Sequence, residues 1–194
     1  MKVLLTGGAG FIGSHIADRL LEEGWKVVVV DNLSTGYERN LNPNVKFYKL
    51  DITDAEALEQ VFAMEKSDIV SHHAAQVDVR RSMDDPKFDA TVNVLGILNI
   101  LQLCVKYKVK KIVFSSTSAV FNEPLYLPMD EKHPVDPISA YGVTKYTSEL
   151  YLRLYFENYG FPYTAFRYGN VYGPRQDPHG ECGVVAIFSE QMLT

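Results

Sequence analysis

A tyrosine and a lysine four residues apart are the side chains of this sequence best suited to acid–base chemistry. Tyr141 and Lys145 lie in Tyr141-Gly142-Val143-Thr144-Lys145, a spacing that places a phenol and an ammonium on one face of a helix. A phenol with a pKa of ~10 is a poor base at neutral pH, and lowering that pKa by about three units requires ~4 kcal/mol. One cation ~6 Å away, at an effective dielectric constant of ~20, supplies only ~2.8 kcal/mol. Tyr141 therefore needs a second positive charge to become a good base.

A glycine-rich turn near the N-terminus could bring that charge by binding a dinucleotide. The segment Thr6-Gly7-Gly8-Ala9-Gly10-Phe11-Ile12-Gly13 lies between an apolar run at residues 3–5 and a helical apolar pattern. Glycines without Cβ atoms let backbone N–H groups approach a diphosphate, and the helix that begins here turns the positive end of its dipole toward it. Two spacings are compatible with such a cradle: Gly7, Gly10 and Gly13, or Gly8, Gly10 and Gly13.

An acidic residue at the end of the second apolar run indicates which dinucleotide would bind. The run at residues 26–30 ends at Asp31, about where a carboxylate accepts hydrogen bonds from an adenosine ribose. Asp31 would repel a 2′-phosphate, and no arginine follows immediately, since Arg39 is the next one. The sequence therefore predicts NAD rather than NADP. The cationic ring of oxidised nicotinamide would be the second charge that Tyr141 needs, so the two motifs would act together.

Alternating strands and helices must position these motifs. The predicted strands cover residues 3–5, 26–30, 45–48, 68–72, 111–115 and 163–168, and the predicted helices cover a segment starting near residue 12, residues 54–65, about 85–107, 140–158, and a segment from residue 184. This order predicts an α/β fold of the Rossmann type, a doubly wound parallel sheet with strand order 3-2-1-4-5-6 and helices on both faces. Thr53 with Glu56 predicts a capping box for helix 54–65, and Ser139 predicts the cap of helix 140–158.

Two of these helices carry more apolar residues than one buried face needs. In helix 86–107 the residues expected to face the sheet are Phe88, Val92, Leu95, Leu98, Leu101 and Val105, which leaves Val94, Ile97, Ile100 and Leu103 facing elsewhere. Helix 140–158 carries a similar excess of leucine and aromatic residues. We therefore expect a homodimer through helices 86–107 and 140–158.

Composition and charge exclude several classes of protein. The 194 residues have a net charge of −5, and the basic residues 80–81 and 110–111 form only pairs, so no nucleic-acid surface is expected. No uninterrupted apolar run approaches the ~18 residues of a membrane span, and a strand follows Met1 directly, so we expect a cytoplasmic protein that does not bind membranes. We expect no metal site, because His72 and His73 would point to opposite faces of a strand and the two cysteines, Cys104 and Cys182, form no CxxC motif.

Taken together, the motifs resemble those of the extended short-chain dehydrogenase/reductases, and more narrowly of the NAD-dependent nucleotide-sugar epimerases and dehydratases. The resemblance covers the whole chain and is carried by residues 6–13, Asp31-Asn32-Leu33, Asp51-Ile52, Ala74-Ala75-Gln76, Ser115-Ser116-Thr117, Tyr141 with Lys145, and residues 167–175. It implies a nucleotide-binding domain at residues 1–168 and, at residues 169–194, the start of a substrate-binding region that continues beyond this chain in the family.

The resemblance also implies roles for individual residues. Tyr141 would be the catalytic base, Lys145 would hold the nicotinamide ribose and tune Tyr141, and Thr117 would bind the reacting sugar oxygen. Asn170 would meet the substrate diphosphate. The cofactor-binding residues expected from the motifs and the resemblance together are Gly7, Gly10, Phe11, Ile12, Gly13, Asp31, Asn32, Asp51, Ile52, Ala74, Ala75, Lys145 and Tyr168. Asp51 also has a simpler interpretation, as a residue at the entry of the helix that follows it.

The residues after Thr117 help to choose between reactions of the family. Members that eliminate water or decarboxylate commonly have an acidic residue just beyond this threonine, whereas Ser118 and Ala119 follow it in this sequence. Oxidation and re-reduction at one carbon is therefore favoured, and the chain is most similar to 4-epimerases of UDP-hexoses. A dehydratase or dehydrogenase of the same family, and an NAD-sensing protein without catalysis, are the alternatives. Phe121-Asn122 departs from the Tyr-Gly that many members carry.

Overall fold

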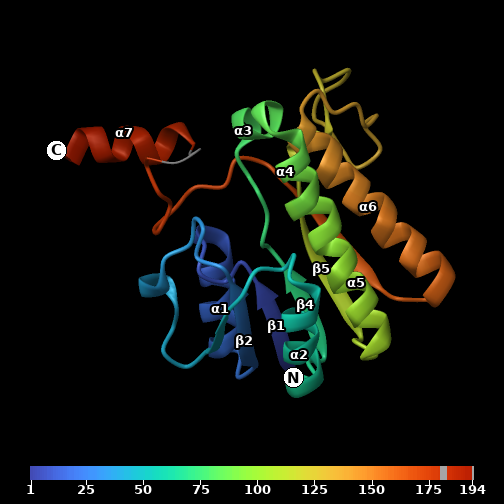
Figure 1. The fold of residues 1–194 in the computed structure, drawn as a ribbon. Coiled ribbons are helices and arrows are strands. Elements are labelled where there is room, and N and C mark those ends of the chain that lie inside the picture. The colour runs from blue at the N-terminus through green and yellow to red at the C-terminus, as the bar shows by residue number, and fades with distance from the viewer. Residues whose placement is uncertain (180–182, 194) are drawn as a thin grey trace.

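Six parallel strands form a single sheet in the computed structural model, which describes residues 1–179 and 183–193. The strand order is β3-β2-β1-β4-β5-β6, as predicted (Figure 1). The strands are β1 (Lys2–Thr6), β2 (Lys26–Asp31), β3 (Lys46–Lys49), β4 (Ile69–His72), β5 (Lys111–Thr117) and β6 (Tyr163–Tyr168). Because all five pairings are parallel, the strands end at the same edge, where the predicted site residues lie.

Helices cover both faces of the sheet, as expected for a doubly wound fold. They are α1 (Phe11–Glu22), α2 (Ala55–Glu65), α3 (Val79–Asp84), α4 (Pro86–Ala90), α5 (Gly96–Lys106), α6 (Ala140–Tyr159) and α7 (Val184–Leu193). Alternate residues of β1 enter different cores: Leu4 packs with residues of α2, α5 and α6, while Val3 and Leu5 pack with α1. No residue of α7 is buried, and this helix extends away from the sheet (Figure 1).

The predicted helix at residues 86–107 contains a π-helical turn, Thr91–Leu95, between α4 and α5. A π turn holds an additional residue, which rotates everything after it by about 100° relative to a regular α-helix. The predicted faces of this helix are therefore wrong in part: Ile97, Ile100 and Leu103 are buried in the main core and Leu95 is 53% exposed, whereas Leu101 is buried as predicted.

This helix is also long and apolar. Pro86–Lys106 has a mean hydropathy of 1.6 over its 18-residue window, enough by length and composition to cross a membrane, although the sequence shows no uninterrupted apolar run. In this fold 44% of that window is buried, and the segment forms one side of the main hydrophobic core.

The caps of the helices correct one prediction and confirm another. Asp54, rather than Thr53, caps α2, because its side chain accepts a 3.0 Å hydrogen bond from Ala57 N. Thr53 instead donates to Asp51. Ser139 caps α6 as predicted, accepting from Gly142 N at 3.0 Å. The short helix α3, capped by Asp78, was not predicted.

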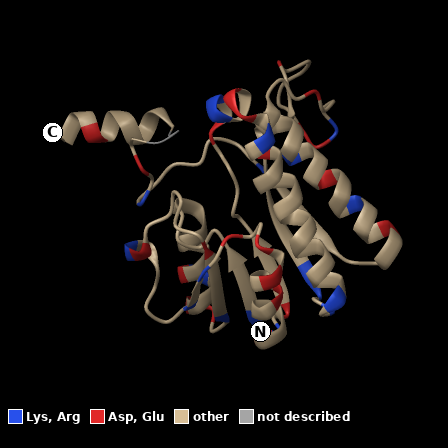
Figure 2. Cartoon of the chain, viewed as in Figure 1, with Lys and Arg blue, Asp and Glu red and all other residues tan. Residues whose placement is uncertain are grey.

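Charged residues of both signs are interspersed over the described part of the chain (Figure 2). Several lysines and arginines pair with carboxylates, as in the 2.6 Å contact between Lys110 and Asp68 and the 2.5 Å contact between Lys106 and Glu59. Lys110 belongs to one of the two basic pairs seen in the sequence, and its charge is thus offset by a neighbouring carboxylate.

Candidate active site

The carboxyl ends of the strands open into one cavity of about 590 Å³. All the predicted site residues line it: Gly7, Gly10, Phe11, Ile12, Gly13, Asp31, Asn32, Asp51, Ile52, Ala74, Ala75, Thr117, Tyr141, Lys145, Tyr168 and Asn170. They come from the ends of all six strands, or the loops directly after them, and from the starts of α1 and α6. The sheet therefore brings together residues that are up to 163 positions apart in the chain, from Gly7 to Asn170.

The glycine-rich turn forms a cradle that side chains would fill. Gly7 has a φ of +71°, and a Cβ atom there would lie 2.5 Å from Ala74 N. A Cβ on Gly13 would lie 2.1 Å from Gly7 O. Gly8 does not line the cavity, since a Cβ there would meet Val29 instead, so the cradle uses Gly7, Gly10 and Gly13. The N-terminus of α1 has no side-chain cap, which leaves its first N–H groups suited to an anion.

Acidic side chains at the ends of β2 and β3 also line the cavity. Asp31 is 7% exposed and accepts hydrogen bonds from Ala9 N at 2.9 Å and Leu33 N at 2.8 Å, so it also fixes the glycine-rich turn. Asp51 accepts from Asn32 Nδ2 at 2.7 Å and from Thr53. Burial opposes ionisation of Asp51, but these hydrogen bonds outweigh it and lower the pKa. Asp51 thus lines the cavity and also holds the start of α2, the second role that the sequence indicated.

Tyr141 and Lys145 lie on one face of α6, at its N-terminal end. The Lys145 ammonium is 5.9 Å from the Tyr141 ring centre and donates a 2.8 Å hydrogen bond to Ser115 O. Burial lowers the pKa of Lys145 to about 8, and the buried carboxylate of Asp89 opposes this shift. The backbone N–H of Tyr141 donates to Ser82 Oγ at 3.1 Å, so α3 also fixes the start of α6.

The ends of β5 and β6 place the other predicted catalytic residue. Thr117 and Tyr168 are register partners on these neighbouring strands. Thr117 Oγ1 accepts a 3.1 Å hydrogen bond from Ala119 N, which uses a lone pair and leaves the hydroxyl proton for another acceptor. Thr117 can therefore donate to an oxygen in the cavity.

His73 is a cavity residue that the sequence did not single out. Its ring stacks on Tyr168, with ring centres 6.5 Å apart, and its Nε2 lies 3.0 Å from Ser71 Oγ. Burial, and then the charge of Lys145, lower the pKa of His73 to about 4, so its ring is neutral at pH 7. Its neighbour His72 is buried in the core and contacts Thr6. The signal for His73 was its place directly before Ala74-Ala75. Across residues 1–179 and 183–193, no cluster of three or more metal-ligating side chains is found; Cys182 lies outside these ranges.

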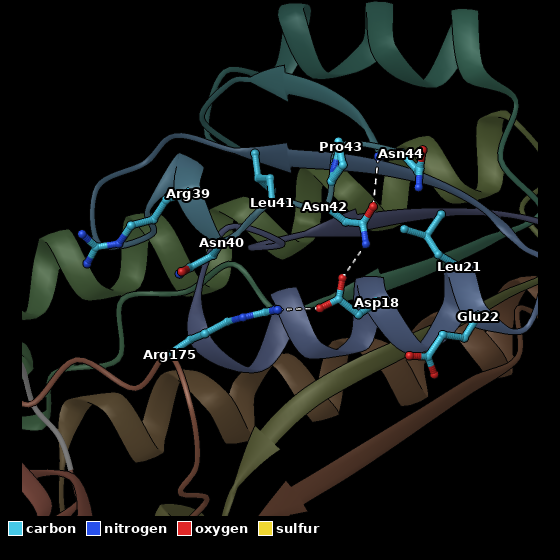
Figure 3. Close-up of a pocket in the computed structure, with 10 residues that line it drawn as sticks. All are labelled: Asp18, Leu21, Glu22, Arg39, Asn40, Leu41, Asn42, Pro43, Asn44 and Arg175. Carbon is cyan, nitrogen blue, oxygen red and sulfur yellow. Dashed lines mark hydrogen bonds and ion pairs between the residues drawn. The ribbon is translucent and has the colours of Figure 1, made fainter.

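A second hollow, of about 540 Å³, lies between α1 and the segment at residues 39–44 (Figure 3). Asp18 lies in this hollow, 2.7 Å from Arg175 and 2.9 Å from Asn42 Nδ2, so its carboxylate is already occupied. His15 Nε2 also contacts Pro174 O, at 2.8 Å. These contacts attach the loop after β6 to α1, and Arg175 lines the larger cavity as well. We therefore interpret the residues around the second hollow as a structural support that holds the loop after β6 in place as a wall of the larger cavity.

Comparison with known proteins identifies the family. Residues 3–194 match the NAD dependent epimerase/dehydratase family. The chain belongs to this family. A relative from Methanocaldococcus jannaschii, named putative UDP-glucose 4-epimerase, is 50% identical over 98% of the chain and 63% of its own length. The UDP-glucose 4-epimerase structure from Thermotoga maritima with UDP-glucose is 50% identical, with a TM-score of 0.97, and that from Thermus thermophilus with NAD is 48% identical, with a TM-score of 0.95. Each of these two matches includes the whole of this chain but only 63% of the length of the solved structure.

The cavity fits the cofactor of the NAD-dependent epimerase/dehydratase family. Cβ atoms on Gly7 or Gly13 would collide with the backbone of the cradle, and Asp31 presents a carboxylate at the end of β2. Phe121, which departs from the usual tyrosine of this family, does not line the cavity. Its ring lies 5.0 Å from the Arg167 guanidinium, so the missing hydroxyl belongs to the supporting layer and not to the wall.

Proposed function

We propose that this chain is the cofactor-binding and catalytic part of an NAD-dependent nucleotide-sugar epimerase of the UDP-glucose/UDP-galactose type. The observation that carries the proposal is the convergence of Tyr141, Lys145 and Thr117 on the cavity that also holds the glycine cradle. The names of the relatives support the choice of substrate. In this proposal residues 1–168 form the NAD-binding domain and residues 169–194 begin the substrate-binding region.

The proposed chemistry assigns one task to each side chain. Tyr141 takes the proton of the sugar hydroxyl and later returns it, and Lys145 keeps the phenolate stable through its charge. Thr117 donates a hydrogen bond to the reacting oxygen, and Asn170 contacts the diphosphate. Bound NAD+ supplies a hydride acceptor that can give the hydride back, so the reaction has no net redox change. The keto-sugar would turn over within the cavity between the two transfers.

The distribution of acidic residues favours epimerisation over elimination. The carboxylates that line the described part of the cavity belong to Asp31, Asp51 and Asp177. Asp31 and Asp51 follow β2 and β3, and Asp177 accepts a hydrogen bond from Tyr37, which also follows β2. Beside Thr117 at the end of β5, the next residues form the 3₁₀ turn Ser118–Val120 and carry no carboxylate. A dehydratase would need a second acid–base group at that position.

The test is to incubate the protein with NAD+ and, separately, with UDP-glucose, UDP-galactose and their N-acetyl forms, and to identify the products by NMR. Interconversion of a 4-epimer pair, abolished in Tyr141→Phe, is the expected result. Conversion to a dehydrated sugar would favour the dehydratase alternative. The same assay is run on a protein in which this chain is extended to the full length of a relative. If both proteins bind NAD+ and neither converts any sugar, the NAD-sensing alternative is favoured.

We also propose that the protein is a cytoplasmic homodimer. Helix α6 and the π turn between α4 and α5 retain exposed apolar side chains after the sheet is covered: Val143, Leu150, Leu154 and Phe156 on α6, and Leu95 on the π turn. Apolar side chains on adjacent helices are typical of a subunit interface. Light scattering at micromolar concentration should give the mass of a dimer, and Leu154→Glu should convert it to a monomer, whereas a monomeric unaltered chain would contradict this proposal.

A further inference from the structure

Glu149, on α6, joins three elements that each carry a residue of the candidate active site. It lies four residues after Lys145 and eight after Tyr141, so the three side chains share one face of the helix. Its side chain is only 12% exposed. Glu149 does not line the cavity, and it therefore acts from beneath the residues that do.

The carboxylate of Glu149 is held by two neighbouring strands. One oxygen accepts hydrogen bonds from Ser116 Oγ and from Arg167 Nε at 3.0 Å, and the other accepts from Arg167 Nη2 at 2.7 Å. Paired N–H bonds between a guanidinium and a carboxylate set direction as well as distance. The Phe121 ring supports the guanidinium at 5.0 Å, so Arg167 is held by Glu149 and by a ring.

The two donors lie one residue before the last residues of β5 and β6, and Ser116 also lines the cavity. Ser116 and Arg167 are register partners, and Thr117 and Tyr168 form the next pair toward the cavity. Through these contacts one carboxylate connects the helix that carries Tyr141 to both strands that carry Thr117 and Tyr168. A shift of α6 along the sheet would have to break these hydrogen bonds.

We propose that Glu149 is a positioning residue that sets the distance from Tyr141 to the bound cofactor and to Thr117. This inference rests on the proposed function, because it concerns the cavity in which NAD+ would bind. An apolar contact could hold α6 against the sheet equally well, but it would not fix the helix in one position along the strands. Displacements of about 1 Å can cost about 10²-fold in rate, so such a fixed position matters for catalysis.

The experiment measures how much NAD+ changes the acid constant of Tyr141. Each variant is titrated in the ultraviolet, with and without NAD+, and the titration of the same variant carrying Tyr141→Phe is subtracted. The direct effect of changing the charge at position 149 is present with and without NAD+, so it cancels in this comparison. Moving a cation from about 6 to about 8 Å, at an effective dielectric constant of about 20, changes an acid constant about threefold.

NAD+ should raise the acid constant of Tyr141 by some factor in the unaltered chain. In Glu149→Gln we expect that factor to be smaller, by about threefold or more. Ser116→Ala, which changes no charge, should reduce the effect of NAD+ in the same direction. Glu157→Gln is the matched control, because Glu157 is an exposed glutamate of the same helix, 3.7 Å from Arg153. This control should titrate like the unaltered chain.

A merely structural role would give a different result. In that case Glu149→Gln and Ser116→Ala would unfold at lower temperature, but NAD+ would change the acid constant of Tyr141 as much as in the unaltered chain. This result would overturn the inference and leave the proposed function standing. Failure of the unaltered chain to bind NAD+ would overturn the proposed function, and this inference with it.

Discussion

Lys145 holds its ammonium 5.9 Å from the ring centre of Tyr141. One cation ~6 Å from the phenolate charge supplies ~2.8 of the ~4 kcal/mol needed to ionise a phenol near pH 7. The hydrogen bond from Lys145 to Ser115 O holds the ammonium in this position. We therefore expect Tyr141 to become an efficient base only when oxidised nicotinamide adds a second charge.

Removing the Tyr141 hydroxyl should separate catalysis from cofactor binding. In Tyr141→Phe, we expect NAD+ affinity to stay within about twofold of the unaltered chain, while epimerisation falls by about 10²-fold or more because the general base is lost. Calorimetric titration with NAD+ and a product assay measure the two quantities. Epimerisation at a near-normal rate in this variant would show that another residue is the base.

Replacing Lys145 should stabilise the fold while it weakens function. The pKa of about 8 in the folded protein lies below the ordinary value of 10.5, so the buried ammonium lowers stability below pH 8, and this loss disappears as the pH rises from about 8 to 10.5. Lys145→Met should therefore increase the free energy of unfolding at pH 7 by about 1–3 kcal/mol, and the gain should shrink toward pH 10.5. Weaker NAD+ binding should accompany it.

Urea unfolding at pH 7 and pH 10 measures this effect of Lys145→Met. Lys132→Met, at an exposed loop position, is the control and should change stability little at either pH. A Lys145→Met variant that is less stable than the unaltered chain at pH 7 would contradict the assigned cost of the buried charge.

Asp31 should determine the choice between NAD+ and NADP+. Its carboxylate lies at the end of β2, where it would repel a 2′-phosphate. In competition titrations, Asp31→Asn should reduce the preference for NAD+ by about tenfold or more, since one charge contact of this kind is worth over ~1.4 kcal/mol. Asp68→Asn, at the opposite end of the sheet, is the matched control. Tighter binding of NADP+ than NAD+ by the unaltered chain would show that Asp31 does not discriminate.

The strands, the helices and the glycine-rich turn could be predicted from local patterns, whereas the assignment of Thr117, Tyr168 and Asn170 to the site came from the resemblance to the family. Alternating apolar runs and helical periodicity indicated the doubly wound fold and hence its strand order, and parallel strands present their carboxyl ends at one edge. Residues that directly follow these runs are therefore expected to lie close together, whether they are glycines, small residues or polar residues. The roles assigned to the individual side chains remain predictions.

Other features depend on tertiary contacts that no local pattern records. Nothing in the residue types of Thr91–Leu95 distinguishes a π turn from an α turn, so the π turn and the resulting rotation of Ile97 and Ile100 could not be foreseen. The six-residue helix α3 is too short for a periodic signal. Glu149 meets partners 18 and 33 positions away, on two different strands, so its position could be found only in the structure.

In the proposed mechanism, hydrogen leaves one sugar carbon as hydride and returns to the same carbon within the cavity. The most direct measurement supplies UDP-galactose labelled with deuterium at C4, with NAD+ in ordinary water, and locates the label in the product by NMR. The account predicts UDP-glucose that retains deuterium at C4, without net accumulation of NADH and without formation in Tyr141→Phe. Product that has lost its deuterium to water would contradict the account, because the hydrogen would then have left as a proton.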